Sequence, residues 1–157
     1  MLIRYPKLIK PKTVVKQQCL NIDMAPTILD LAGIEIPDYM QGESMMQLIS
    51  GEPSPKWRTS ILFEYYLDTY WPYAGPNQIA VRTDRYKLVD SFLKNDIDEL
   101  YDLQNDPGEM TNLITLEQYD DVEDKLRQEA ERLKEKYNYK ADRDWWLRRV
   151  LKEKKIK

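Results

Sequence analysis

The clearest hydrophobic pattern lies near the end of the chain. Apolar or aromatic side chains recur there every three or four residues, at Tyr119, Val122, Leu126, Ala130, Leu133 and Tyr137. This spacing places them on one face of an α-helix, and the preceding Thr115-Leu-Glu-Gln118 has the form of a capping box. We therefore expect an amphipathic helix at about 115–137 whose apolar face packs against a sheet.

The middle of the chain favours short strands separated by turns. Four stretches bounded by turn residues favour strands, and all but the last are rich in β-branched or aromatic residues: 60–66, 78–82, 86–92 and 99–103. The connection at 83–85 is tight, and Asn105-Asp-Pro-Gly108 is a strong turn signal. These patterns predict an α+β fold, in which a small antiparallel sheet of three to four strands is covered by the C-terminal amphipathic helix.

The first fifty residues show a different pattern. Leu2–Tyr5 and, more weakly, Thr13–Val15 have the composition of strands, whereas Met24–Ala32 is apolar nearly all round a helix. Asp23 is a suitable N-cap for that helix, and Gly33 supplies the left-handed residue that ends it. So short an apolar helix is unstable alone, and we expect it to need a larger body that buries it.

Composition places the chain among globular proteins. Of its 157 residues, 42% are hydrophobic and 32% are charged, and no apolar run approaches the ~20 residues of a membrane span. The stretch after Met1 lacks the long apolar region of a secretory signal peptide. A single cysteine excludes an internal disulfide but leaves the compartment open, export to the periplasm or the cell exterior included.

Charge is distributed unevenly along the chain. The net charge is −3, but residues 140–157 alone carry a net charge of +5 and include Trp145 and Trp146. Such a basic segment suits docking on another part of the protein, binding to a membrane surface or partner helix, or a solvated end. We expect no nucleic acid as a partner.

The sequence excludes several catalytic arrangements. It has no histidine, so neither a Ser/His/Asp triad nor a histidine-containing metal site can form. Glycine-rich phosphate loops are absent as well. Acids cluster at 120–124, where the start of the predicted helix favours negative charge without any metal. We therefore assign no catalytic residue and no metal ligand to this chain.

Three blocks of the sequence resemble the C-terminal part of type I sulfatases, in that family's order and at plausible spacing. They are NIDMAPTILDLAG at 21–33, AVRTDRYKLV at 80–89 and ELYDLQNDPGEMTNL at 99–113. The resemblance implies that residues 1–52 end a large alkaline-phosphatase-like α/β domain and that 53–139 form the sulfatase C-terminal subdomain. That subdomain has a four-stranded antiparallel sheet and a covering helix. Residues 140–157 lie outside the resemblance, as a basic tail.

The resemblance also describes a chemistry that these residues do not carry. Type I sulfatases use a formylglycine made from the Cys or Ser of a C/S-x-P-x-R motif, together with a divalent cation, usually calcium. Here Cys19 is followed by Leu-Asn-Ile, and no position matches that motif. We therefore expect no cofactor in this chain and no hydrolysis by the chain alone, with calcium and formylglycine belonging to the parent enzyme.

Candidate substrate-binding residues lie in and beside the aromatic loop at 67–77. Trp71 and Tyr73 have flat faces that suit a sugar ring, and Asp68 is placed to accept a hydrogen bond from a sugar hydroxyl. Alternatively, these aromatic residues pin the loop to the body of the protein as core. Arg82 is a candidate sulfate ligand, although alternation along a strand need not place it on the face of Lys87. A structural pairing of the cations Arg82, Arg85 and Lys87 with Asp84, Asp102 or Asp106 is the competing interpretation.

These observations predict that the chain is the C-terminal part of a sulfatase that acts on a sulfated carbohydrate. The partner of this part is the large domain of the same enzyme, which this chain lacks. The alternative is a stand-alone module that binds a glycan or another polyanion without catalysis, and a third interpretation is an interaction protein that uses the basic tail. The apolar helix at 24–32 favours the first interpretation, because a free module would expose it. For the same reason we expect the isolated chain to self-associate.

Overall fold

The computed structural model describes residues 1–52, 54–65, 78–91 and 97–139. The chain divides into two compact units, Met1–Thr59 and Ser60–Lys157. Each unit has its own cluster of buried apolar side chains.

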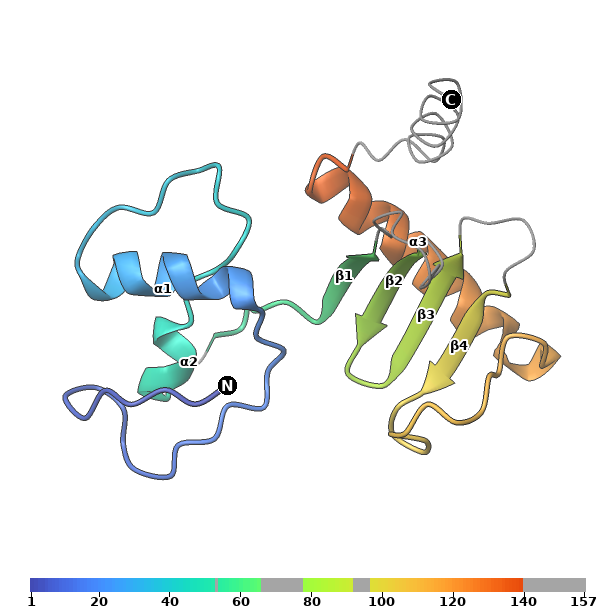
Figure 1. Cartoon of the computed structure of the whole chain (residues 1–157), viewed down its shortest axis with the longest axis horizontal. Helices are drawn as coiled ribbons and strands as arrows, with labels where there is room; N and C mark the ends of the chain where they lie inside the picture. The colour runs from blue at the N-terminus through green and yellow to red at the C-terminus, as the bar shows by residue number, and fades with distance from the viewer. Residues whose placement is uncertain (53, 66–77, 92–96, 140–157) are drawn as a thin grey trace, which may run out of the picture. The chain divides into compact units, whose positions relative to one another are not determined.

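The second unit is built on a four-stranded sheet. Its strands are β1 (Ser60–Tyr65), β2 (Gln78–Thr83), β3 (Tyr86–Ser91) and β4 (Glu99–Asp102). They lie in the order β1-β2-β3-β4, and every neighbouring pair is antiparallel (Figure 1). The connection between β2 and β3 is tight, because only two residues separate Thr83 from Tyr86, and a chain that reverses within so few residues pairs with its own predecessor.

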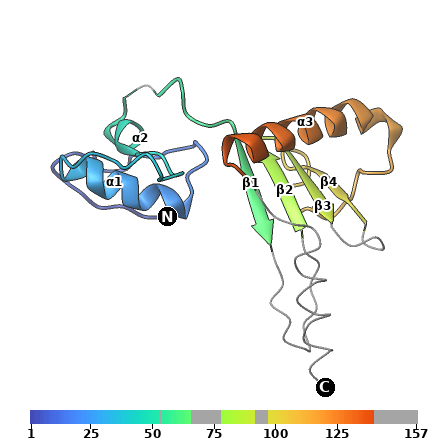
Figure 2. The same ribbon diagram turned by 90° about the horizontal axis from the view of Figure 1, so that it is seen from above.

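Helix α3 (Asp120–Lys136) covers one face of this sheet (Figure 2). The register aligns one row of apolar side chains across all four strands: Leu62, Val81, Leu88 and Leu100. Against this row the helix buries Leu126, Ala130 and Leu133. The predicted α+β fold, with a small antiparallel sheet and an amphipathic covering helix, is therefore confirmed.

The predicted start of the covering helix is wrong. A short 3-10 turn, η2 (Glu117–Tyr119), comes first, and the N-cap of α3 is Tyr119, which makes no side-chain capping bond. The chain just before it is still held by β4, because the Leu113 N–H donates to the Leu100 carbonyl at 2.8 Å. Thr115 then lies inside a turn that the Leu116 N–H closes by donating to the Leu113 carbonyl at 3.0 Å, so the helical turn begins only after Leu116 and Thr115 does not act as the cap.

The polar side chains of the block at 99–113 form a network of hydrogen bonds with its backbone. Asn112 Oδ1 accepts the backbone N–H groups of Leu100 and Ile114, at 3.0 and 3.1 Å. Asp106 Oδ2 accepts those of Met110 and Thr111, both at 2.8 Å. These side chains supply acceptors for backbone donors that no strand partner satisfies, and so they hold the loop after β4 in one shape.

The first unit contains helices but no strand among its described residues. Its elements are the 3-10 turn η1 (Asn21–Asp23), α1 (Met24–Leu31) and α2 (Met46–Ser50). The predicted strands at Leu2–Tyr5 and Thr13–Val15 are therefore wrong. A strand needs a neighbour to pair its backbone, and instead the Tyr5 carbonyl accepts the N–H groups of the residues that follow, Leu8 and Ile9, in a turn.

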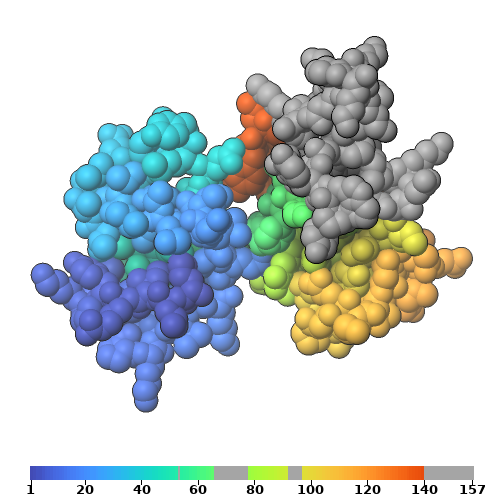
Figure 3. All heavy atoms as spheres, viewed as in Figure 1, coloured from blue at the N-terminus to red at the C-terminus, as the bar shows by residue number. Residues whose placement is uncertain are grey.

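Helix α1 matches its prediction closely. It ends in a Schellman motif, in which Gly33 has φ +69° and the Ile34 N–H donates to the Leu29 carbonyl at 2.9 Å. Pro26 and Thr27 are buried, whereas Met24, Ile28 and Leu31 are 48%, 62% and 41% exposed. Large apolar side chains thus remain on the surface of the first unit, which Figure 3 shows in blue to teal.

Asp23 precedes α1 as expected, but its side chain does not cap the helix. The carboxylate is fully buried and accepts the N–H groups of Leu20 and Glu43 at 2.7 and 2.9 Å, together with both terminal nitrogens of Arg58. Burial alone would raise the pKa of Asp23, but the hydrogen bonds from Arg58 and from the two backbone N–H groups outweigh it and lower that pKa. The ion pair joins three separate segments of the first unit.

Candidate functional site

The candidate site lies on the face of the sheet that points away from α3. Side chains alternate between the two faces of a strand, so the residues beside Val81 and Leu88 point away from α3. A hollow of about 350 Å³ lies on this face. Its lining residues are Phe63, Tyr65, Gln78, Ala80, Arg82, Lys87, Val89 and Glu99. We call it the sheet-face hollow.

Arg82 and Lys87 lie directly opposite each other on β2 and β3. Opposite residues of an antiparallel pair share a face, with Cβ atoms roughly 4.5–5.5 Å apart. The sequence left their relative orientation open, because alternation along one strand does not give the register between two strands. The register brings both cations to the sheet-face hollow.

The two cations differ in their surroundings. Lys87 Nζ pairs with Glu109 Oε2 at 2.5 Å and lies 5.9 Å from the centre of the Tyr101 ring. Glu109 has φ +55°, a backbone conformation uncommon for a residue with a side chain. Arg82 is exposed and forms no ion pair with any residue that the structure describes. Its guanidinium is therefore the one available to an external anion.

Arg85 has a structural role, as one of the two competing interpretations predicted. Its Nε and Nη2 atoms donate to the Asp102 carboxylate at 2.8–3.2 Å, while Asp102 also accepts the Gln104 N–H at 3.1 Å. The hydrogen bonds from Arg85 lower the pKa of Asp102. This pair fixes the β2–β3 turn to the end of β4, so Arg85 is not a ligand-binding residue. Lys87 pairs with Glu109 and not with any of the predicted aspartates.

Three of the four predicted substrate-binding residues, Asp68, Trp71 and Tyr73, lie outside the described residues. The fourth, Arg82, lies in the sheet-face hollow. Phe63 was not predicted as a site residue, and Lys87 was weighed only as one of three cations, beside Arg82 and Arg85. Their signal is present in the sequence as every second residue of adjacent strands, but it can be used only once the strand register is known.

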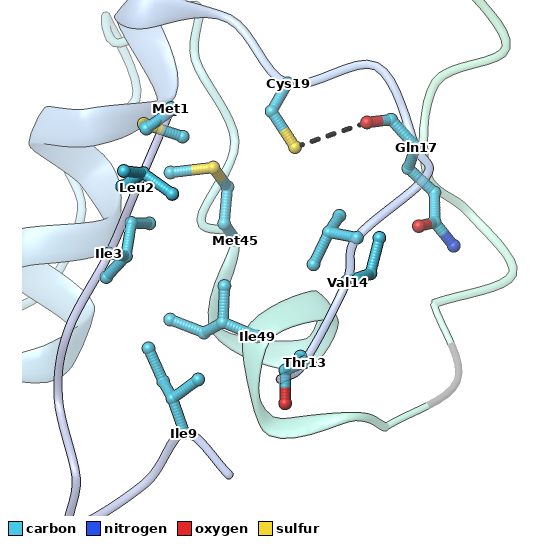
Figure 4. A pocket seen from close by; sticks show the side chains of 11 residues that line it. Met1, Leu2, Ile3, Ile9, Thr13, Val14, Gln17, Cys19, Met45 and Ile49 are labelled. Atoms are coloured by element: carbon cyan, nitrogen blue, oxygen red, sulfur yellow. Dashed lines mark hydrogen bonds between the residues drawn. The ribbon is translucent and has the colours of Figure 1, made fainter. Parts of the chain in front are cut away.

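A second hollow, of about 460 Å³, lies in the first unit (Figure 4). Apolar side chains of the N-terminal segment line it together with Met45 and Ile49. Cys19 borders it, and its thiol donates to the Gln17 carbonyl at 3.5 Å. Burial, and then the nearby negative charge of Asp23, raise the pKa of Cys19, which disfavours the reactive thiolate. These surroundings therefore do not favour Cys19 as a nucleophile.

Neither unit offers a metal site within the described ranges. No group of three or more Asp, Glu, Cys or His side chains converges there in a way that could hold an ion. In the same residues, no helix has the length and apolar character needed to cross a membrane. The described surface is suited to binding. It offers the guanidinium of Arg82, the ammonium of Lys87 and the exposed aromatic rings of Phe63 and Tyr65.

The chain has the architecture of the C-terminal part of sulfatases. A small helical unit comes first, and a four-stranded antiparallel sheet with one covering helix follows. The family model for "N-sulphoglucosamine sulphohydrolase, C-terminal" matches residues 1–136, and the chain belongs to this family. The chain is 33% identical over 141 residues to an N-acetylglucosamine-6-O-sulfatase of Bacteroides thetaiotaomicron, covering 87% of this chain and 25% of the relative. A Delta 4,5-hexuronate-2-O-sulfatase of the same bacterium is 32% identical over 102 residues, which are 65% of this chain and 21% of the relative.

Solved structures agree with this assignment. A protein solved with its substrate D-glucosamine-2-N,6-O-disulfate matches with a TM-score of 0.82 and 29% identity, over 90% of this chain and 29% of that one. A putative sulfatase from Bacteroides thetaiotaomicron gives a TM-score of 0.66 at 29% identity, over 74% and 24% of the two chains. The chain thus spans about a quarter of the length of the curated relatives that it matches first.

Proposed function

We propose that this chain forms the C-terminal part of a sulfatase that hydrolyses a sulfate ester of a carbohydrate. The observation that carries the proposal is the match over 90% of the chain to a protein bound to a disulfated glucosamine. The two curated relatives named above also act, by their names, on sulfated sugars. In this proposal the catalytic residues belong to a large domain encoded together with this chain, because the 157 residues contain neither histidine nor a C/S-x-P-x-R motif.

The parent enzyme uses a formylglycine and calcium in this account, and the residues of this chain do not fit either group. Cys19 has a raised pKa and is followed by Leu-Asn-Ile, which removes the sequence context for its conversion. The described carboxylates do not converge into a metal site. The role of this chain is therefore structural support and the supply of substrate-contacting side chains, Asp68, Trp71, Tyr73 and Arg82.

The large domain is also the proposed partner of the first unit. Met24, Ile28 and Leu31 remain substantially exposed on α1, and such a contiguous apolar surface favours association. In the intact enzyme this surface packs inside the large domain. In the isolated chain it drives self-association.

Two measurements test the proposal. The first is to sequence the DNA upstream of the codon for Met1, where we expect a continuous reading frame that encodes a C/S-x-P-x-R motif. The second is to express that complete frame with a formylglycine-generating enzyme and to measure sulfate release from N-acetylglucosamine 6-sulfate. A stop codon immediately upstream, with a monomeric and cooperatively folding chain, would instead support the stand-alone binding module.

A further inference from the structure

We propose that the sheet-face hollow binds a sulfated monosaccharide unit, with Arg82 holding the sulfate group. The choice of a sulfated sugar as the ligand rests on the proposed function, whereas the location and the residues rest on the geometry of the second unit. The volume of about 350 Å³ lies within the range of roughly 300–1,000 Å³ found for small-molecule sites.

Charge is the first argument for this ligand. Of the two acids beside the hollow, Glu99 accepts a hydrogen bond from the Tyr101 hydroxyl at 3.0 Å, and Glu109 pairs with Lys87. Arg82 has no ion-pair partner among the described residues, and the lining of the hollow carries two positive charges, on Arg82 and Lys87, against the one negative charge of Glu99. A guanidinium binds the oxygens of a sulfate in a bidentate manner, which adds geometric specificity to the charge.

Lys87 can strengthen the same contact. It lies directly across from Arg82, and an ammonium has three N–H donors, of which the salt bridge to Glu109 needs one. A sulfate bound to Arg82 therefore lies within reach of a second cation. The ion pair with Glu109 holds the Lys87 side chain in place, which reduces the conformational entropy lost when an anion binds.

The shape and lining of the hollow suit a sugar ring next to that sulfate. The register places Phe63, Ala80, Val89 and Glu99 in one row across the four strands. The short side chains of Ala80 and Val89 form the floor, while Phe63 and Tyr65 are 42% and 55% exposed at the β1 side. Apolar rings beside polar groups, here Gln78 and Glu99, match the apolar face and the hydroxyl rim of a sugar.

The test is a titration of the 157-residue chain with N-acetylglucosamine 6-sulfate, followed through its backbone amide NMR shifts. We expect shifts concentrated on residues of β2 and β3 around Arg82 and Lys87, and much smaller shifts with unsulfated N-acetylglucosamine. The Arg82→Gln variant should bind at least about tenfold more weakly, because it loses a charge-assisted hydrogen-bonded pair. The Arg82→Lys variant, which keeps the charge but loses the planar fork, should lie between the two.

Lys125→Gln is the matched control. It removes one positive charge from an exposed position of α3, on the other layer of the same unit, and should leave the affinity unchanged. Three results would each overturn the proposed binding site: equal shifts with the two sugars, unchanged affinity of Arg82→Gln, or no shifts at about 10 mM sugar. A concentration of about 10 mM fills about nine-tenths of a site with a Kd of about 1 mM. The titration measures binding and not hydrolysis, so a negative result would not contradict the proposed role in a sulfatase. Conversely, a failure of that role would not contradict a positive binding result.

Discussion

Arg58 and Asp23 form a buried bidentate ion pair between segments 35 residues apart in the sequence. Their side chains are 4% and 0% exposed, and Nη2 of Arg58 lies 2.7 Å from Oδ1 of Asp23. Arg58 also lies over the Trp57 ring, 4.6 Å from its centre, and the Trp57 indole donates to the Gln18 carbonyl at 3.0 Å. This cluster ties the start of α1 to the last residues of the first unit.

Loss of one partner of this pair should strongly destabilise the first unit. Arg58→Met leaves the Asp23 carboxylate buried without its counter-charge, and we expect a cost of about 3–5 kcal/mol. Hydrogen exchange of the Leu20 and Glu43 amides, which bond to Asp23, reports this directly. Arg132→Met, which breaks an exposed pair on α3, is the control and should cost at most about 1 kcal/mol. Similar costs for both variants would contradict the account.

The same pair predicts a loss of stability in acid. The pKa of Asp23 is lower in the folded protein than its unfolded value of about 3.9. Its contribution is therefore fully present above that unfolded value and is lost as the pH falls through the folded pKa. Denaturant melts of the wild type and of Asp23→Asn should converge as the pH drops below about 4. A constant difference in unfolding free energy between pH 7 and pH 3 would rule out this linkage.

The helix–sheet core of the second unit should respond to a single truncation. Leu126 is 4% exposed within the cluster between α3 and the sheet, and Leu126→Ala should cost about 2–5 kcal/mol of unfolding free energy. Lys125→Ala, at the neighbouring exposed position, should change it by less than about 0.5 kcal/mol. Urea denaturation measures both variants, and a cost near zero for Leu126→Ala would mean that the helix is not packed on the sheet.

The isolated chain should form dimers or larger species at micromolar concentration. Ile28, 62% exposed on α1, is at the centre of the apolar surface that we assign to the large-domain contact. In sedimentation experiments, Ile28→Lys should shift the population towards monomer. Met110→Lys, at a more exposed position of the second unit, should leave the distribution as in the wild type. A purely monomeric wild type would argue for the stand-alone module.

The aromatic loop leads to a prediction for the intact enzyme. If Trp71 stacks on a sugar ring, Trp71→Ala should reduce kcat/KM for a sulfated glycan by about 1–3 kcal/mol in activation free energy. A small aryl sulfate, which lacks the sugar, should be hydrolysed almost as well as by the wild type. An equal loss on both substrates would assign Trp71 to the core.

The sequence predicted those parts of the fold that depend on local patterns. The helical stripe through Leu126 and Leu133 and the tight turn at 83–85 each follow from residues close together in the chain, and both are present. The start of α3 depends on a bond between Leu113 and Leu100 that no local pattern encodes. Leu2–Tyr5 has a strand-like composition, but strands require a partner that the described residues do not provide.

The candidate site shows the same limit. Arg82 was recognised by its chemistry. Its position opposite Lys87 follows from the strand register, which determines which residues of neighbouring strands lie opposite each other. The role of Asp23 was misjudged in a similar way. Its position before a helix predicts a cap, whereas burial beside Arg58, far away in the sequence, makes the ion pair the stronger interaction.

The most direct test of the account is sulfate release from N-acetylglucosamine 6-sulfate, measured for two purified proteins side by side. One is the 157-residue chain, and the other is the protein encoded by the complete upstream reading frame, both prepared with calcium and a formylglycine-generating enzyme. We predict turnover by the longer protein and none above the buffer rate by the chain. Release that scales with the concentration of the chain and disappears in Cys19→Ala would contradict the account.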